Sequence, residues 1–169
     1  LLDDDVLAWH LSVDTKPIFL RQLLDMRQMM EPKAAGWAAQ HGTDAQHADI
    51  EAAQIRMEEE SHSIEDFVVA DALFHRAILR AANNEILLSM EGVIFSALLS
   101  SIRLTNRDPR ENASSIPFHR KVLDAIKVRD HTQAEKMMND HLSDTSQRLK
   151  SVLGETAGGV ISNGESRTG

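Results

Sequence analysis

Apolar residues recur at intervals of three and four along most of this 169-residue chain, which is the spacing of one face of an α-helix. No stretch shows the strict alternation of apolar and polar residues that a half-buried strand would have. Glycine, proline, asparagine or aspartate interrupts the apolar runs, and these residues commonly bound helices. We therefore predict an all-α fold whose six main helices span about 17–41, 44–60, 64–82, 85–105, 116–128 and 131–153.

Short-range signals mark the expected helix boundaries. Capping pairs, which satisfy free N–H groups of a first turn, are predicted for Thr43 with Gln46, Ser63 with Asp66, and Asp130 with Gln133. Gly42 is a suitable C-terminal stop, and Asn83 tolerates the left-handed conformation that a break requires. Pro32 lacks an N–H donor and clashes with the preceding turn, so we expect a kink or a break there. The polar segment 106–115 is predicted to be a loop.

Short connections between consecutive helices favour antiparallel neighbours, so an antiparallel bundle of about six to seven helices is expected. Apolar residues make up 42% of the chain and charged residues 26%, which is typical of a single globular domain. The net charge of −8 repels phosphate backbones, so this chain is not expected to bind DNA itself. The absence of cysteine excludes thiolate metal ligands and fits a cytoplasmic location. No apolar run approaches the roughly 20 residues that span a membrane.

Three predicted helices carry side chains that can bind a metal. Asp71 and His75 are four residues apart in one helix, so they share a face. His119 lies near the start of the next-but-one predicted helix, and His141 lies in the last. One carboxylate and three imidazoles can bind Zn²⁺, Ni²⁺, Mn²⁺ or Fe²⁺. These residues therefore predict a central metal or ligand cavity in the bundle.

An alternative explains the same four residues without a metal. A histidine on a partly apolar helix is more often a core residue with a hydrogen-bond partner, and Asp71 with His75 can form a plain intrahelical pair. Spacing alone does not favour the metal over this alternative. The remaining histidines lie near predicted helix ends or polar faces and are predicted to be surface residues: His10, His41, His47, His62 and His131. The single Glu-x-x-His, at 59–62, is one motif short of a di-iron bundle.

Three stretches of the chain form an ordered pattern. The stretch 71–84 begins Asp-Ala-Leu-Phe-His and ends Asn-Asn, the stretch 119–142 begins His-Arg-Lys-Val-Leu-Asp-Ala-Ile and ends His-Leu, and the stretch 24–35 contains Arg-Gln-Met-Met-Glu-Pro. Together they resemble the FCD domain, the C-terminal sensor of GntR-family regulators of the FadR subfamily. The resemblance covers about 19–153, and its one departure is Asn83, where the family often has glycine.

The resemblance implies a domain organisation and a metal site. In the family, the aspartate and the three histidines that correspond to Asp71, His75, His119 and His141 bind a divalent metal in many members, so one ion is expected here, Zn²⁺ first, with Ni²⁺, Mn²⁺ or Fe²⁺ as alternatives. Residues 1–16 are expected to link to a winged helix-turn-helix domain that this sequence lacks. Residues 17–153 are expected to form the effector domain. The composition of 154–169, rich in glycine and serine, predicts a disordered tail. Operator DNA would be bound only through the absent domain, and a homodimer is expected.

The resemblance also implies an effector, a small organic acid and in particular a sugar acid such as galactonate. Arg27 lies in the apolar first helix, where it can pair with Glu31 four residues later or offer its guanidinium to an effector carboxylate; the resemblance favours the second role. Arg103 is a further effector-binding candidate, with a surface arginine as the equal alternative. Asn84 is a candidate partner for effector hydroxyls. The expected function is the ligand-sensing half of a repressor.

Two other classes of function compete with this one. The first is a helical interaction or dimerisation module whose metal is purely structural. The second is a metal-dependent hydrolase or lyase, because a metal with an open position activates water. The second class also needs a general base, and the sequence places no further Glu or His beside the four residues at a convincing spacing. The chain is therefore not expected to be an enzyme.

Overall fold

The computed structural model describes residues 17–105 and 109–152 of the chain. Every regular element in these two ranges is a helix, which confirms the predicted all-α class. The helices are α2 Pro17–His41, α3 Asp44–Glu59, α4 Ile64–Ala81, α5 Glu85–Ser89, α6 Glu91–Thr105, α7 Pro109–Lys127 and α8 His131–Val152. The predicted linker 1–16 and the predicted tail 154–169 lie outside the described residues. No helix in the described ranges is long and apolar enough to span a bilayer.

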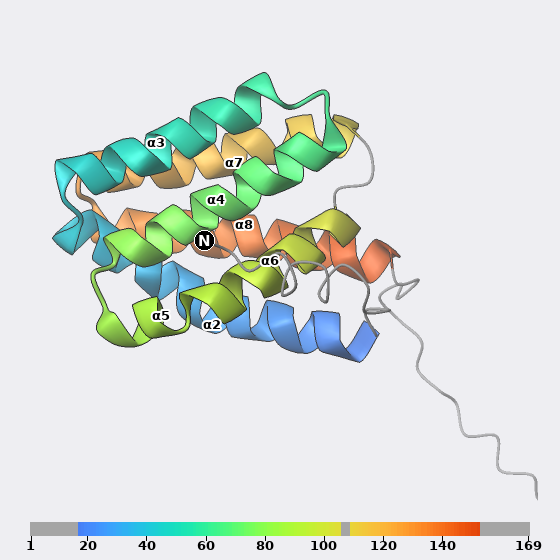
Figure 1. Cartoon of the computed structure of the whole chain (residues 1–169), viewed down its shortest axis with the longest axis horizontal. Coiled ribbons are helices and arrows are strands. Elements are labelled where there is room, and N and C mark those ends of the chain that lie inside the picture. The colour runs from blue at the N-terminus through green and yellow to red at the C-terminus, as the bar shows by residue number, and fades with distance from the viewer. Residues whose placement is uncertain (1–16, 106–108, 153–169) are drawn as a thin grey trace, which may run out of the picture.

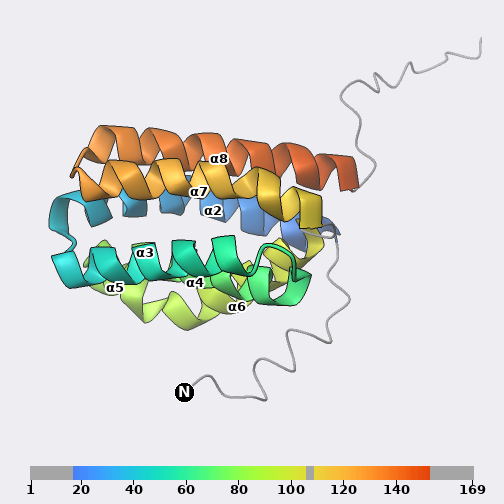
Figure 2. The ribbon, with the colours of Figure 1, turned by 90° about the horizontal axis from the view of Figure 1, so that it is seen from above.

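The helices pack as a bundle with α4 near its centre (Figure 1). The hairpins α3–α4 and α7–α8 pair antiparallel helices along their lengths, and α2 lies along α8 (Figures 1 and 2). Helix α4 also packs on α2 and α6. Its residues Phe67, Phe74 and Ile78 are 0–1% exposed, because apolar side chains three or four apart share one helical face. The central position of α4 brings its polar residues within reach of several other helices.

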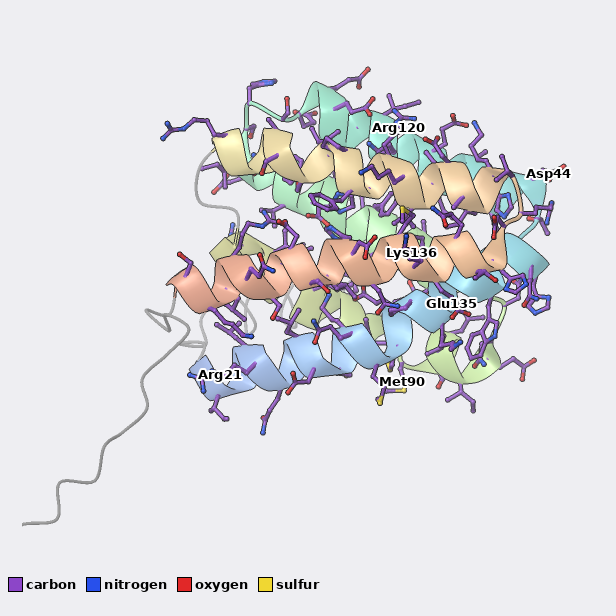
Figure 3. The ribbon with its side chains drawn as sticks, turned by 180° about the vertical axis from the view of Figure 1, so that it is seen from behind. Arg21, Asp44, Met90, Arg120, Glu135 and Lys136 are labelled. Atoms are coloured by element: carbon purple, nitrogen blue, oxygen red, sulfur yellow. The ribbon has the colours of Figure 1, made fainter. Side chains whose placement is uncertain are left out.

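Helix α2 is continuous through Pro32, so the alternative of a break at this residue is wrong. Pro32 lacks the donor of one intrahelical hydrogen bond, yet it is buried where α2 packs against α8 and α4. Packing of an apolar face supplies most helical stability in proteins, and it here outweighs the local cost of the proline. A salt bridge joins α2 to α8, with Lys33 Nζ 2.7 Å from Glu135 Oε2. Figure 3 shows Glu135 between these two helices.

Helix α7 begins at Pro109, so the prediction that 109–115 is a loop is wrong. Proline suits the first turn of a helix, where its missing N–H needs no partner. Two polar residues at the start of this helix face inward. Asn112 is 0% exposed and its Nδ2 donates to the Ser61 carbonyl at 3.2 Å. Ser115 is 1% exposed and its hydroxyl donates to the Asn112 carbonyl. A buried face made of polar residues gives no apolar periodicity, which is why the sequence pattern missed it.

The single helix predicted for 85–105 is two helices, α5 and α6, which meet at Met90. The capping predictions are confirmed: Thr43 and Gln46 form a reciprocal capping box, and side chains of Ser63 and Asp130 accept from backbone N–H groups three residues on. Asn83 has a φ of 51°, the left-handed conformation expected of it. Local hydrogen bonding therefore fixes most of the boundaries.

Candidate metal centre

One aspartate and three histidines from three helices meet in the core. His75 Nε2 and His119 Nε2 each lie 3.2 Å from Asp71 Oδ1. His141 Nε2 lies 3.3 Å from His75 Nε2. The four residues are 0–4% exposed, and the nitrogens of the three histidines lie within 4.8 Å of one another. The structure thus brings together all four residues that the sequence proposed as metal ligands.

The outer ring nitrogens of two histidines set which nitrogen faces the centre. His119 Nδ1 donates to the Ser115 carbonyl at 3.0 Å. His75 Nδ1 lies 2.7 Å from Glu31 Oε2, although its N–H is not directed along a regular hydrogen bond. An acceptor at Nδ1 favours the tautomer that leaves the Nε2 lone pair for a metal. His141 Nδ1 is buried without a hydrogen-bond partner among the described residues.

The nitrogens of the three histidines lie close enough together to hold one divalent cation, and the carboxylate of Asp71 contacts two of them. Bonds of about 2.0–2.1 Å to Zn²⁺ at tetrahedral or somewhat smaller angles place neighbouring donors roughly 3–3.4 Å apart, and the contacts of 3.2–3.3 Å fall in this range. Three imidazoles with one carboxylate also suit Ni²⁺, Mn²⁺ or Fe²⁺. Asp71, His75, His119 and His141 would hold the ion, which would supply an acidic centre open to an anionic ligand.

Burial and the neighbouring charges set the protonation of the centre. Burial alone would raise the pKa of Asp71, but His119 and His75 hold that pKa well below its usual value, so the carboxylate is ionised. Burial lowers the pKa of His141 well below its usual value, and His119 and His75 lower it further. Burial and the charge of Arg27 also act to lower the pKa of His75, but the carboxylates of Glu31 and Asp71 together outweigh them and the pKa is raised.

Helix α2 adds two charged residues to the centre. Arg27 and Glu31 are each 1% exposed, and Arg27 Nε donates to Glu31 Oε1 at 2.7 Å. Arg27 Nη2 lies 3.3 Å from His75 Nε2, so the guanidinium also reaches the histidine cluster. Burial alone would raise the pKa of Glu31, but Arg27 and His75 lower it to about 2. Both roles considered for Arg27 are thus geometrically compatible, because it pairs with Glu31 while lying at the centre.

Glu31 is the part of the site that sequence reasoning missed. The sequence named it only as an ion-pair partner of Arg27, and it placed no further carboxylate beside the four ligand candidates. The structure corrects this, because Glu31 contacts His75 directly from the side away from Asp71. The available signal was the Arg-x-x-x-Glu spacing within the helix, which puts both charges on one face. Which helix that face meets is a tertiary property.

Two effector-binding candidates lie away from the centre, and one histidine that was predicted to lie at the surface is buried. Arg103 is an exposed residue at the end of α6, with Nη2 3.8 Å from Glu65 Oε1, which matches the surface alternative. Asn84 caps α5, and its Oδ1 accepts from the N–H groups of the second and third residues that follow. His47 was predicted to be a surface residue, but it is 7% exposed and its Nε2 lies 2.9 Å from the Ala38 carbonyl. The α2–α3 corner encloses it.

Two hollows described by the structure lie away from the centre. The larger, of about 360 Å³, lies between α3 and α4 and includes Ala52 and Leu73 in its lining. The smaller, of about 210 Å³, lies between α2 and α8 and includes Arg21, which Figure 3 labels at the start of α2. Neither is lined by Asp71 or by a histidine of the cluster. The side chains of the centre instead contact one another directly.

The fold and the site together define a class of domain. It is an all-α bundle with a buried carboxylate–histidine cluster where four helices meet. Within this class, the chain belongs to the FCD domain family, which matches residues 22–144. This match confirms the resemblance carried by the sequence motifs.

Named relatives are regulators of transcription. The chain is 29% identical over 153 residues to the galactonate operon transcriptional repressor of Escherichia coli (strain K12), covering 89% of this chain and 66% of that protein. It is 25% identical over 147 residues to the Glc operon transcriptional activator of the same strain, covering 82% and 58%. The chain therefore spans less than two thirds of the length of these relatives. They and the family support a regulatory domain rather than an enzyme.

A solved structure shows the same fold. E. coli McbR/YncC superposes on this chain with a TM-score of 0.68 at 18% sequence identity, over 79% of this chain and 65% of that one. At this identity the likeness concerns the arrangement of the helices alone.

Proposed function

We propose that this chain is the ligand-sensing part of a transcriptional repressor, and that it binds one divalent metal and one small organic acid. The carrying observation is the convergence of Asp71, His75, His119 and His141 to contacts of 3.2–3.3 Å in the core. A buried polar cluster of this kind is costly unless its groups are paired or coordinate a metal. Operator DNA would be bound by a separate winged-helix domain.

The charge of the centre supports an anionic effector. The carboxylates of Asp71 and Glu31 with the guanidinium of Arg27 leave one buried negative charge when the three histidines are neutral. A divalent cation reverses this to one positive charge. One monocarboxylate then makes the buried centre neutral, whereas a neutral or cationic ligand leaves it charged, which is unfavourable in a region of low dielectric constant.

A sugar acid is the proposed effector class. Galactonate, from which one relative takes its name, is a polyhydroxy monocarboxylate, so it carries the single negative charge that the centre requires. Its carboxylate would bind the metal and the guanidinium of Arg27, which offers a planar fork of donors. Because Arg27 already donates to Glu31, the effector would have to share the guanidinium with that carboxylate.

Helix α2 is the element that would report binding. It carries Arg27 and Glu31, it contacts α4 and α8, and it follows the segment expected to lead from the DNA-binding domain. An effector shifts a conformational equilibrium only if it binds one arrangement more tightly than the other. A ligand bound to Arg27 would contact α2 directly and α4 through Glu31 and His75. It would meet this requirement by binding more tightly to the arrangement of α2 that brings Arg27 to the metal.

Metal content tests the first half of the proposal. Purified wild-type chain should hold one divalent ion per subunit in elemental analysis, while His119→Ala and His141→Ala should hold much less. His62→Ala is the matched control. His62 is exposed, so this substitution removes one imidazole without altering the centre. Equal metal content in the wild type and both core variants would show that these histidines are not ligands.

Calorimetry tests the second half. Losing the charge-assisted contact of Arg27 should weaken galactonate binding by at least about tenfold, equivalent to roughly 1.5–3 kcal/mol. The affinity of Arg27→Lys for galactonate should lie between those of the wild type and Arg27→Ala. Lysine keeps the positive charge but loses the planar pair of donors that the guanidinium offers. Galactose, which lacks the carboxylate, is the control ligand and should not bind. Undiminished acid binding by Arg27→Ala would overturn the role of this residue.

A structural metal in an interaction module is the second candidate function. The observation in its favour is that the four residues are 0–4% exposed and that neither described hollow reaches them. In this case metal content would depend on His119 and His141 as above, while a panel of aldonates and dicarboxylates would produce no heat of binding.

A further inference from the structure

Helices α3 and α4 lie side by side (Figure 1), and the hollow of about 360 Å³ lies between them. From α3 it is lined by Asp49, Ala52, Ala53 and Arg56, which are spaced three and four apart and so share one helical face. The volume falls within the range of about 300–1,000 Å³ that is typical of sites for small molecules. The hollow is therefore large enough for a small organic ligand.

Helix α4 contributes a second face with the same spacing. Its lining residues are Leu73, Arg76, Ala77 and Arg80. Asp71 and His75 lie on the same helix but do not line the hollow. The hollow is thus separate from the metal centre, and the inference below does not depend on the proposed function.

Small apolar side chains form the floor of the hollow. Ala53 is buried, Leu73 and Ala77 are half-buried, and Ala52 is exposed. An alanine side chain ends at Cβ, so these positions leave room for a ring or an alkyl chain to pack on the floor. They offer no side-chain donor or acceptor for a hydroxyl group. The floor therefore suits an apolar body.

The charges about the hollow leave it positive. Arg56, Arg76 and Arg80 line it together with Asp49. Glu91 of α6 pairs with Arg76 Nε through Oε1, and its Oε2 accepts from Arg80 Nε at 3.0 Å. Three arginines against two carboxylates leave one positive charge, on a chain whose net charge is −8. A single anionic group is the complement of this lining.

Two of the arginines have donors to offer a ligand. Arg56 is exposed and forms no ion pair with another residue of the described ranges. Arg76 is held in place, because it pairs with Glu91 through Nε and its guanidinium lies 4.9 Å from the centre of the Phe95 ring. Its two Nη groups point no acceptor away from a ligand, since the contact with Glu91 uses Nε. A guanidinium fixed before binding loses less conformational freedom when the ligand arrives.

We propose that this hollow binds a small monocarboxylate with an apolar body, of the aryl-alkyl type. The carboxylate pairs with Arg56, and Arg76 supplies the second positive group. The apolar body packs on Ala52, Ala53 and Ala77 beside Leu73. The one negative charge of the ligand cancels the one positive charge of the lining. The absence of hydroxyl groups distinguishes this ligand from the sugar acid proposed for the metal centre.

Binding is expected to be weak. The hollow is open to solvent, so water and salt screen the pairing of the carboxylate with the exposed Arg56. Ordering that long side chain also costs free energy. We therefore expect a dissociation constant of about 1–10 mM.

An NMR titration of the isotope-labelled 169-residue chain with phenylpropionate tests the proposal. Up to about 20 mM of this acid should shift the amide signals of Ala52, Ala53 and Ala77 with one common dissociation constant. Acetate, which lacks the apolar body, should bind at these residues at least about tenfold more weakly. Phenylpropanol, which lacks the charge, should bind about threefold more weakly or worse.

Two substitutions separate the effect of charge from that of shape. Arg56→Gln should raise the dissociation constant by about three- to fivefold, because it removes the unpaired guanidinium. Ala52→Phe fills the hollow from an exposed position and should abolish the shifts. Arg103→Gln removes an exposed arginine of α6 outside the hollow and should bind as the wild type does. The amide spectrum of each variant without ligand establishes that it is folded.

The contrary results are equally definite. Shifts confined to the amides around His75 and His119 would place the acid at the metal centre and overturn the proposal. Unchanged binding by Ala52→Phe would place the ligand on another surface. Equal affinities of Arg56→Gln and the wild type would rule out recognition of the carboxylate by Arg56. A wild-type chain without shifts up to about 20 mM would exclude the site at the affinity expected of it.

Discussion

At the scale of single residues, the candidate metal ligands come from three helices and lie close together in the core. Asp71 and His75 lie one turn apart on α4, and His119 and His141 reach the same point from α7 and α8. The candidate effector-binding residues, Arg27, Arg103 and Asn84, do not lie together. They were chosen by residue type, and no spacing within the sequence related one of them to another. Only Arg27 of that group lies at the centre, since its helix packs on α4.

Glu31→Gln should weaken metal binding by about 10–100-fold, the effect typical of losing a partner that orients a ligand. The amide cannot carry the negative charge that now lies 2.7 Å from His75 Nδ1, so the imidazole is held less firmly with Nε2 toward the centre. Competition with a chelator of known affinity measures the change. Glu85→Gln, at an exposed carboxylate on α5, is the matched control. Equal affinities in the three proteins would mean that Glu31 serves only the pairing with Arg27.

At the scale of elements, tight corners and polar caps decide where the helices end. The α2–α3 corner is tightly packed. Gly42 is buried there, and its N–H donates to the Ala38 carbonyl at 2.9 Å. His47, buried on the first turns of α3, reaches the same carbonyl. The C-terminal end of helix α2, about three turns beyond Glu31, is thereby fixed relative to α3.

Gly42→Ala should destabilise the fold by about 1–3 kcal/mol, as overpacking of a tight site does. A Cβ at this position would lie 2.4 Å from the Ala38 carbonyl oxygen and 2.5 Å from His47 Nε2, and backbone has little freedom to move aside. Gly92→Ala is the contrasting change, because a Cβ there meets nothing within 4 Å. In the helix α6 it should stabilise by about 0.4–1 kcal/mol. Urea unfolding measures both, and equal effects of the two substitutions would contradict the crowding at Gly42.

At the scale of the whole molecule, the centre joins helices that are distant in the sequence. The proposed ligands lie on α4, α7 and α8, and α2 is tied to them through Glu31. A bound ion would therefore stabilise the packing of the bundle and not only the site.

The net charge of −8 still leads us to predict that this chain alone does not bind duplex DNA at physiological salt.

Removal of the metal should lower the midpoint of thermal unfolding by about 5–10 °C. A ligand at about 100 times its dissociation constant stabilises the folded state by about 2.7 kcal/mol, and 1 kcal/mol corresponds to roughly 2–4 °C in a domain of this size. Differential scanning calorimetry with and without a chelator gives the shift. His141→Ala should unfold at the same temperature in both conditions. A chelator effect of the same size in that variant would assign the stabilisation to another site.

What the sequence determined is mostly local. Apolar periodicity specified the all-α class, because a helix that packs on one side must repeat its apolar residues every three to four positions. Side-chain caps specified the starts of α3, α4 and α8, because those hydrogen bonds join residues three apart. The spacing of Asp71 and His75 likewise required only one helix.

Tertiary packing decided the rest. Helix α2 continues through Pro32 because its neighbours hold it, and α7 begins at Pro109 because polar residues of its first turns are buried. The contact of Glu31 with His75 depends on which face of α2 meets α4, and the sequence spacing within either helix does not contain that information. Local hydrogen bonding thus set the pieces of the site, and the packing of four helices set which charges meet at its centre.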